Sequence, residues 1–444
     1  MTRDDGQGGS DQMGFLRHLF VPIYMPAILF ATGEGALIPV VPLTAKALGA
    51  GLAGAGLISG LLMIGVVIGD MPSGYAVARW GETFAMRLAA VIAIISAIAC
   101  RMATNLIVLS IGVLMIGIAS ATFNLARHSF LTTWTPWWYR ARAMSLLGGT
   151  TRVGAFIGPF IAAPVIALSG SDDVYWIHVM ACLGVLILLW VTPDPEKELS
   201  ANLSVARSER GLDTPAPTTG KTARQPLSMQ ATTDADSDAT EGSAASGSRR
   251  HRLSVLTYLP ILIRLGTAAG ILQMLRASRQ VILPLWGVQL NIPESRIAVI
   301  VGIAGAVDLS LFYTSGQVMD RFGRRWVAAP VLAGLSLAHL LLPLATAEWG
   351  YVTVAILLSL ANGMGSGIVM TLGSDLATRY AADDTPGFLS GWRVFTDSGS
   401  AAGPLAISGM TALAGLWSAP VLMGICGLAG AFMMVRYIPR LVGR

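Results

Sequence analysis

Two short stretches, "GYAVARWGET" at Gly74–Thr83 and "GQVMDRFGRR" at Gly316–Arg325, follow one pattern. Each has a glycine, four residues, an arginine, one residue and a second glycine. The second stretch is richly charged, whereas the first has Ala78 at the place that Asp320 takes in the second. A motif that occurs twice in one chain suggests an internal duplication, and the rest of the sequence can be tested for it.

The composition is that of a membrane protein. Of the 444 residues 54% are hydrophobic and only 12% are charged, and the mean hydropathy is +0.64. Apolar runs of about 20 residues, long enough to cross a lipid core of about 30 Å as helices, recur along the chain. We predict twelve transmembrane helices surrounded by membrane lipids, beginning near Leu19, Gly51, Phe84, Leu106, Ala143, Val174, Thr257, Ile297, Trp326, Tyr351, Gly387 and Trp417. We expect the first to be retained rather than removed as a signal peptide, because Glu34 interrupts its apolar run.

A polar stretch divides these spans six and six. Between Thr192 and Leu253 the chain is rich in Ser, Thr, Ala, Asp, Gly and Pro, and such a segment cannot bury enough apolar surface to fold. The predicted organisation is a cytoplasmic tail at 1–18, a six-helix bundle at 19–192, a flexible cytoplasmic linker at 193–253, a second six-helix bundle at 254–438 and a cytoplasmic tail at 439–444.

The distribution of Lys and Arg predicts the orientation, since cytoplasmic loops carry the excess of both. The tails and alternate loops hold most of them, which predicts cytoplasmic termini and a multi-pass protein of the cytoplasmic membrane. The opposite loops offer mainly Lys46, Arg101 and Arg296. The net charge of +5 is then a consequence of topology, and no nucleic-acid binding is expected.

Further matches between the halves support duplication. "GAFIGP", with Gly154, Gly158 and Pro159, recurs as "GSAAGP", with Gly399, Gly403 and Pro404. Pro39 matches Pro284 at the same offset, and Gly117 matches Gly365 at nearly the same one. Several matches in chain order on corresponding spans indicate two copies of one unit.

Two six-helix halves, a long central loop and the Gly316–Arg325 motif resemble the major facilitator superfamily over nearly the whole chain. The resemblance implies two pseudo-symmetric helical bundles and a conformational latch at the cytoplasmic side, in which a loop carboxylate meets a helix start of the other half. The latch residues it implies are Gly74, Arg79, Gly81, Gly316, Asp320, Arg321, Gly323, Arg324 and Arg325. Since Ala78 and Glu82 depart from the motif in the first copy, the latch should be lopsided; Asp70, one turn earlier, could compensate.

The two GxxxGP stretches allow two interpretations. They resemble a motif of drug–proton antiporters in this superfamily, which favours export. Small residues at this spacing also simply let two helices pack closely. Against the export reading, those exchangers usually carry an arginine on helix four, where this chain has Val113.

Charged residues within the spans are the candidate site. A charge at the bilayer centre costs roughly 2.5–3.5 kcal/mol on insertion scales, so such residues face the protein interior and mark transport pathways. The repeat aligns Glu34 with Arg279, Arg127 with Asp375, and Arg152 with Asp397, always with opposite sign. Parallel repeats place aligned residues at equal depth on opposite sides of a central cleft. The predicted cleft residues for substrate or proton are Glu34, Arg127, Arg152, Arg276, Arg279, Asp308, Asp375 and Asp397.

Their partners stay open at this stage. The aligned charges could pair across the halves, or Glu34 with Arg152 and Arg279 with Asp397 could pair within them. Asp308 is a third candidate partner for Arg152. Arg276, three residues from Arg279, could form a cationic patch with it or snorkel towards the membrane surface.

We predict a secondary transporter that exports amphiphilic or cationic small molecules in exchange for protons, as a monomer. One alternative is transport of an organic anion or sugar-like solute bound by the arginines; another is a non-transporting receptor or assembly partner on a transporter fold. No phosphate-binding loop, nucleophile arrangement or metal-ligand spacing is present, and Cys100, Cys182 and Cys426 all fall in apolar spans. The sequence therefore predicts no enzyme activity, cofactor or metal.

Overall fold

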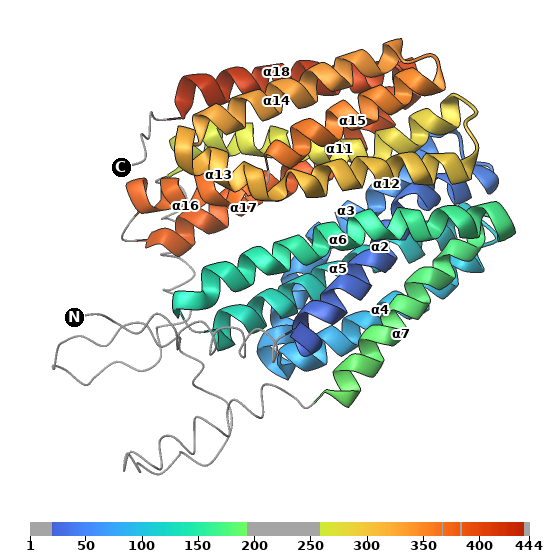
Figure 1. Cartoon of the computed structure of the whole chain (residues 1–444), viewed down its shortest axis with the longest axis horizontal. Coiled ribbons are helices and arrows are strands. Elements are labelled where there is room, and N and C mark those ends of the chain that lie inside the picture. The colour runs from blue at the N-terminus through green and yellow to red at the C-terminus, as the bar shows by residue number, and fades with distance from the viewer. Residues whose placement is uncertain (1–19, 136, 193–257, 366, 382–383, 439–444) are drawn as a thin grey trace.

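The computed structural model describes residues 20–135, 137–192, 258–365, 367–381 and 384–438. The predicted tails and linker lie outside the described residues. Each predicted span has a helix at its place (Figure 1), the largest shift being at the fifth, predicted from Ala143 and observed from Trp137. The first half comprises a π-helix η1 (Phe20–Tyr24), α2 (Met25–Ala47), α3 (Leu52–Trp80), α4 (Glu82–Arg101), α5 (Leu106–Trp134), α6 (Trp137–Ser169) and, after a 3-10 turn η2 (Ser171–Asp173), α7 (Val174–Val191).

The second half differs in that two of its spans are broken. Helix eight is split into α12 and α13 at Leu311, and helix ten into α15 and α16 beside Gly365 and Gly367. The helices are α10 (Leu259–Ile261) with a π-helix η3 (Leu262–Gly266), α11 (Thr267–Gln289), α12 (Glu294–Ser310), α13 (Phe312–Phe322), α14 (Arg325–Leu341) with a 3-10 turn η4 (Leu342–Leu344), α15 (Glu348–Met364), α16 (Ile368–Tyr380), α17 (Thr385–Ala414) and α18 (Ser418–Tyr437).

Ten helices of the described chain are long and apolar enough to cross a membrane. The two spans outside that set are the eighth, α12 with α13, and the eleventh, α17. The eighth carries Asp308, and the eleventh carries Arg393 and Asp397. The break at Leu311 divides the eighth span into helices of 17 and 11 residues, whereas the charges of the unbroken eleventh lower its hydropathy.

The packing of the helices repeats from one half to the other, which confirms the duplication. In the first half α2 packs against α6 and α7, α3 against α5, and α4 against α5 and α7. In the second half α11 packs against α17 and α18, α12 against α15, and α14 against α15 and α18. The halves lie side by side (Figure 1) and meet where α3 contacts α17 and where α6 contacts α12.

The two ends of the bundle can be named from the chain. We call the end at which α2 begins, α7 ends, α10 begins and α18 ends the linker end, and the opposite one the far end (Figure 1).

The repeated second glycine of the opening motif has a conformational cause. Gly81 ends α3 with φ 87° and Gly323 ends α13 with φ 87°. Side chains with a Cβ rarely adopt this backbone conformation, so glycine allows the tight reversal into the next helix. The motif is therefore written twice because the same reversal occurs twice.

The GxxxGP stretches are close-packing sites. A Cβ at Gly158 would lie 2.4 Å from the backbone nitrogen of Ala36 on α2, and a Cβ at Gly403 would lie 2.5 Å from the carbonyl oxygen of Met274 on α11. Backbones approach this closely only where side chains are absent. In both halves these glycines therefore lie where two helix backbones are in close contact.

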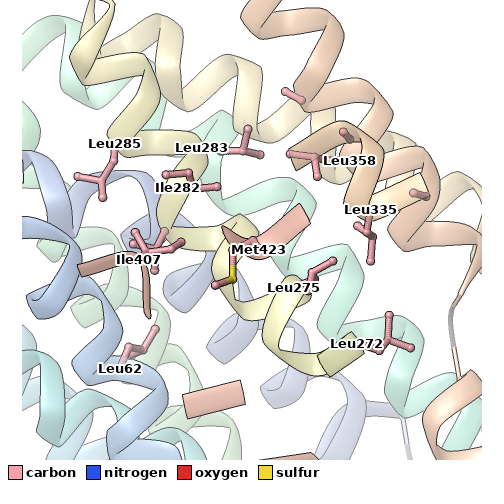
Figure 2. Close-up of a cluster of buried hydrophobic side chains, with 14 of the residues drawn as sticks. Leu62, Leu272, Leu275, Ile282, Leu283, Leu285, Leu335, Leu358, Ile407 and Met423 are labelled. Carbon is pink, nitrogen blue, oxygen red and sulfur yellow. The ribbon is translucent and has the colours of Figure 1, made fainter. Parts of the chain in front are cut away.

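Apolar contact between the halves is concentrated at the far end. One buried cluster joins far-end residues of the first half to the second half, and Leu62, Leu285 and Ile407 of three different helices belong to it (Figure 2). A second buried cluster, around Phe30 and Phe130, contains only first-half residues among those described and lies towards the linker end. The halves thus share a hydrophobic core at the far end and have separate packing towards the linker end.

Glycines tighten this far-end seal. A Cβ at Gly60 of α3 would lie 2.4 Å from Cβ of Pro404 on α17, and a Cβ at Gly302 of α12 would lie 2.8 Å from the ring of Phe160 on α6. The Ser408 hydroxyl also donates to the Ala53 carbonyl, at 2.8 Å. At the far end, α3 is therefore packed tightly against α17 and α6 against α12.

Candidate functional site

A largely buried carboxylate joins the two halves near mid-depth. Asp308 on α12 accepts from Nη1 of Arg152 on α6 at 2.8 Å, from Nη2 of Arg279 on α11 at 3.4 Å, and from Nδ2 of Asn362 on α15 at 2.7 Å. Its side chain is 13% exposed. We call Arg152, Arg279, Asp308 and Asn362 the central cluster. It lies on the linker side of the seal, because Arg152 is about two helical turns from Phe160 along α6.

Close helix packing fixes the geometry of this cluster. Gly305 places α12 against the backbone of α6, since its Cβ would lie 3.2 Å from Cα of Phe156. Gly363 does the same for α15, since its Cβ would lie 3.0 Å from the carbonyl oxygen of Asp308. The Arg152 guanidinium also lies over the Phe312 ring, 5.0 Å from its centroid, at the break between α12 and α13.

A further arginine lies beside the cluster, and its hydrogen bonds to described residues go to neutral oxygens. Arg276 donates to Oε1 of Gln273 at 3.1 Å and to the carbonyl oxygen of Gly365 at 2.6 Å. That carbonyl lies at the break in helix ten and also accepts from the Ile368 backbone N–H at 3.2 Å, and the neighbouring carbonyl of Met364 accepts from Ser315 at 2.7 Å. Arg276 therefore lies inside the protein rather than snorkelling to the membrane surface.

In the first half, a chain of hydrogen bonds runs from α2 through α5 to α6. Ser120 donates to Oε1 of Glu34 at 3.0 Å, and Asn124 donates to Ser120 at 3.2 Å. Arg127, 4% exposed, donates to Oδ1 of Asn124 and to the Thr151 hydroxyl at 3.1 Å. Thr151 precedes Arg152 of the central cluster, so the polar groups of the two halves adjoin.

A second cross-half ion pair lies nearer the linker end. Arg393 on α17 lies 4.0 Å from Oδ2 of Asp70 on α3 and 3.9 Å from Oδ2 of Asp397. The Arg393 side chain is 63% exposed, and charge pairs of this exposure and length contribute little. Asp70 thus reaches the other half from a position near the altered first motif.

The latch residues form different contacts in the two halves. Arg324 donates from Nε to Oδ2 of Asp375 at 2.8 Å and from Nη1 to the Met319 carbonyl at 3.2 Å. Glu82, which aligns with Arg324, accepts from the Ser129 hydroxyl at 3.0 Å. The loop after the second helix is therefore tied to the fourth helix of each half, with reversed polarity. Gly74, Arg79 and Gly81 lie on or at the end of α3, Gly316, Asp320 and Arg321 lie on α13, and Arg325 begins α14.

The structure separates the predicted charges into groups. Among the described residues, no ion pair joins any of the three aligned pairs, and neither of the two alternative pairs within a half forms. The third possibility, Arg152 with Asp308, is the one observed. The reason is that helix five of one half packs directly on helix eight of the other, which brings these two side chains together.

Several contributors were not singled out by the sequence. Ser120, Asn124 and Asn362 are neutral, so a search for intramembrane charges passes over them. Arg393 stands one turn before Asp397 on the same helix, a spacing at which opposite charges commonly interact. That spacing was the available signal.

The electrostatic balance around the middle of the bundle is positive. Arg127, Arg152, Arg276 and Arg279 face two carboxylates, Glu34 and Asp308, in the hydrogen-bonded groups just described. The residues that the structure describes contain no group of three or more His, Cys, Asp or Glu side chains able to hold a metal ion. What the arrangement offers a ligand is guanidinium groups, which bind carboxylate and phosphate in a fork geometry.

Comparison with known proteins agrees with the fold. The model of the Major Facilitator Superfamily matches residues 24–262 and 265–443. The chain belongs to this superfamily. The family and its fold are those of transporters rather than enzymes. The prediction that the chain is a transporter and not an enzyme is confirmed.

Three solved structures share the fold. A D-xylose-proton symporter superposes with a TM-score of 0.67 at 16% identity, covering 97% of this chain and 99% of that one. The xylose transporter of E. coli in a partially occluded inward open conformation gives 0.65 at 14% identity, covering 96% and 100%. A POT family transporter in complex with a thioalcohol conjugated peptide gives 0.70 at 11% identity, covering 95% and 96%.

One curated relative is similar over part of its length. The "Probable anion transporter 6" of Oryza sativa subsp. japonica is 28% identical over 148 residues. The match spans 33% of this chain and 34% of the relative.

Proposed function

We propose that this transporter moves a small organic anion, bearing a carboxylate or phosphate group, together with a proton. The observation that carries the proposal is the excess of guanidinium groups at mid-depth, and above all Arg276, whose hydrogen bonds go to neutral oxygens. Charge-assisted hydrogen bonds to an anion are shorter and stronger than those to a neutral oxygen. An anionic substrate is therefore a better partner for Arg276 than the groups it now binds.

The geometry of Asp308 supports coupling to a proton. Three donors converge on its carboxylate, in the arrangement that a substrate carboxylate would need. If the substrate takes Arg152 and Arg279, the displaced carboxylate would lie in a largely buried place without its partners. A buried unpaired charge is costly, and binding a proton removes that cost. Substrate anion and proton would thus be held together.

Of the functions predicted from the sequence, transport of an organic anion fits the site better than export of cations. Four guanidiniums against two carboxylates repel a cation, and the GxxxGP stretches that favoured the antiporter reading are packing sites. The partial similarity to a protein described as a probable anion transporter points the same way.

The orientation predicted from Lys and Arg also remains a proposal, with the linker end in the cytoplasm. Arg101 and Arg296 at the far end are each paired with a carboxylate, Asp173 at 2.9 Å and Glu348 at 2.8 Å. The far end therefore presents few unpaired basic groups, as expected of the side that crosses the membrane during insertion.

The test is transport by the purified full chain in liposomes with an imposed pH gradient. The panel comprises mono- and dicarboxylates, a sugar phosphate, a neutral sugar and a lipophilic cation. We expect an anion to accumulate in the liposomes. Arg276→Gln should lower the initial rate of anion uptake more than about tenfold, because one charge-assisted hydrogen bond is lost. Arg276→Lys should retain more of this rate. Movement of the cation or the neutral sugar with no anion moved contradicts the proposal, and a chain that moves none of them favours the receptor alternative.

A further inference from the structure

The end of the last helix carries two guanidinium groups on one aromatic ring. Tyr437 is the final residue of α18, at the linker end. The Arg436 guanidinium lies 5.7 Å from the centroid of its ring, and the Arg264 guanidinium, from the π-helix η3, lies 5.5 Å from the same centroid. The packing of η3 against α18 brings Arg264 to this place.

Neither of these arginines has a carboxylate partner among the described residues. Both side chains are exposed, and the aromatic ring supplies only a weak attraction, about 0.5–1 kcal/mol at exposed sites. Two like charges on one ring repel each other, so the arrangement favours an anion that binds both.

The first half provides a comparison within the same molecule. Its sixth helix also ends near an aromatic residue under a guanidinium, with Arg87 of α4 5.5 Å from the Trp190 ring centroid. Arg87 additionally donates to the carbonyl oxygen of Leu189 at the end of α7. The first-half arginine is thus engaged by the end of a neighbouring helix, α7, whereas Arg264 and Arg436 make no such hydrogen bond within the described part of the chain and have donors for another molecule.

The surroundings identify the kind of anion. Ile263, Phe432 and Val435, on the same two elements, are 52%, 68% and 41% exposed, as expected of side chains that face acyl chains. Tyrosine and arginine are typical of the boundary between the lipid core and the headgroups. A ligand that binds here meets cationic groups and an apolar surface side by side.

We infer that Arg264, Arg436 and Tyr437 bind the phosphate of an anionic phospholipid, with its acyl chains against α18 and η3. Guanidinium groups bind phosphate oxygens in pairs, and basic sites between membrane helices recognise anionic headgroups. The inference does not depend on the transported substrate, because these residues lie apart from the central cluster.

The test measures lipid binding to the delipidated full chain in detergent. Phosphatidylglycerol is titrated against phosphatidylcholine, with bound lipid counted by native mass spectrometry and the midpoint of thermal unfolding recorded. We expect phosphatidylglycerol to bind more tightly to wild type. Arg264→Gln and Arg436→Gln should each weaken it about fivefold, since a basic residue near an anionic surface is worth about 1 kcal/mol.

Controls make the outcome specific. Arg87→Gln should leave the preference for phosphatidylglycerol within about twofold of wild type, because that guanidinium already donates to the end of α7. Glycerol phosphate, which lacks acyl chains, should not compete at equal concentration. Equal binding of both lipids by wild type, full competition by glycerol phosphate, or unchanged binding in the double Arg264→Gln, Arg436→Gln variant would overturn the inference. The first two outcomes need no variant to fold.

Discussion

Replacing Asp308 by asparagine separates its two proposed roles, resident counter-ion and proton acceptor. The side chain keeps its shape but loses its charge, so Arg152 and Arg279 lose their common carboxylate. Two of its contacts are short, at 2.8 Å and 2.7 Å, and one is long, at 3.4 Å. Hydrogen bonds to charged groups contribute about 1.5–3 kcal/mol each. An incoming anion competes with at least one short contact of Asp308. Removing the Asp308 charge should therefore tighten anion binding roughly 10- to 100-fold.

The same change should destabilise the empty protein. Removing one partner of a buried ion pair costs about 3–5 kcal/mol. A bound anion at 100 times its dissociation constant should restore about 2.7 kcal/mol. We therefore expect Asp308→Asn to have a lower melting midpoint without anion and a larger shift on adding it than wild type.

Transport provides the decisive measurement. In liposomes Asp308→Asn should still exchange internal for external anion, but should not accumulate it when a pH gradient is imposed. Asp397→Asn serves as the matched control, because Asp397 is 36% exposed and its contact with Arg393 is 3.9 Å long. It should change binding and melting little. If Asp308→Asn binds anions no more tightly and still accumulates them with the gradient, the assignment of Asp308 is refuted.

Three further changes test the packing and the inter-half contacts. Gly158→Ala should lower the stability by about 1–3 kcal/mol in a thermal melt, because its Cβ would lie 2.4 Å from backbone. Gly148→Ala on the same helix, where a Cβ would meet nothing within 4 Å, should be neutral or stabilising. Equal losses in the two variants would contradict the packing account. Gly60→Val should disrupt the far-end seal and increase labelling of nearby engineered cysteines from that side. Labelling like that of Gly54→Val, where a Cβ would lie at an ordinary contact distance of 3.5 Å from Cβ of Ala50, would count against the seal. Arg393→Gln should change the transport rate less than about fivefold, since an exposed, long ion pair contributes about 0–1 kcal/mol; a complete loss would mean that Arg393 does more than pair with its neighbours.

The sequence predicted the parts of the fold that depend on apolar length and on repetition. Apolar runs locate the spans because lipid requires every backbone group to be bonded within the helix, and the repeated glycines mark a reversal that needs positive φ. The breaks in helices eight and ten were not predicted. Leu311 carries no breaking signal. The carbonyls of Met364 and Gly365 at the other break accept from Ser315 and Arg276 of other helices, which only the tertiary structure brings near.

The candidate site was predicted as a set of residues but not as a set of contacts. Aligning the halves indicates the depth of each charge, whereas the partner depends on which helices pack together and how each is rotated. Because helix five packs against helix eight, Arg152 pairs with Asp308. Asp397, which aligns with Arg152 in the repeat, lies beside Arg393 instead. Neutral residues such as Asn362 enter the site because a carboxylate has more acceptor positions than its charged partners fill.

The continuous and broken helices give the two copies unequal mechanical properties. In the first half α3 and α5 run unbroken, and they touch backbone to backbone, since a Cβ at Gly65 would lie 2.2 Å from the Leu114 carbonyl oxygen. The corresponding helices of the second half are each interrupted near the central cluster, at Leu311 and between α15 and α16. Bending during the transport cycle should therefore be concentrated in α13 and α16, with the first half serving as a stiff frame against which they move. The two copies of the unit thus differ at the same two helices, which are continuous in the first half and interrupted in the second.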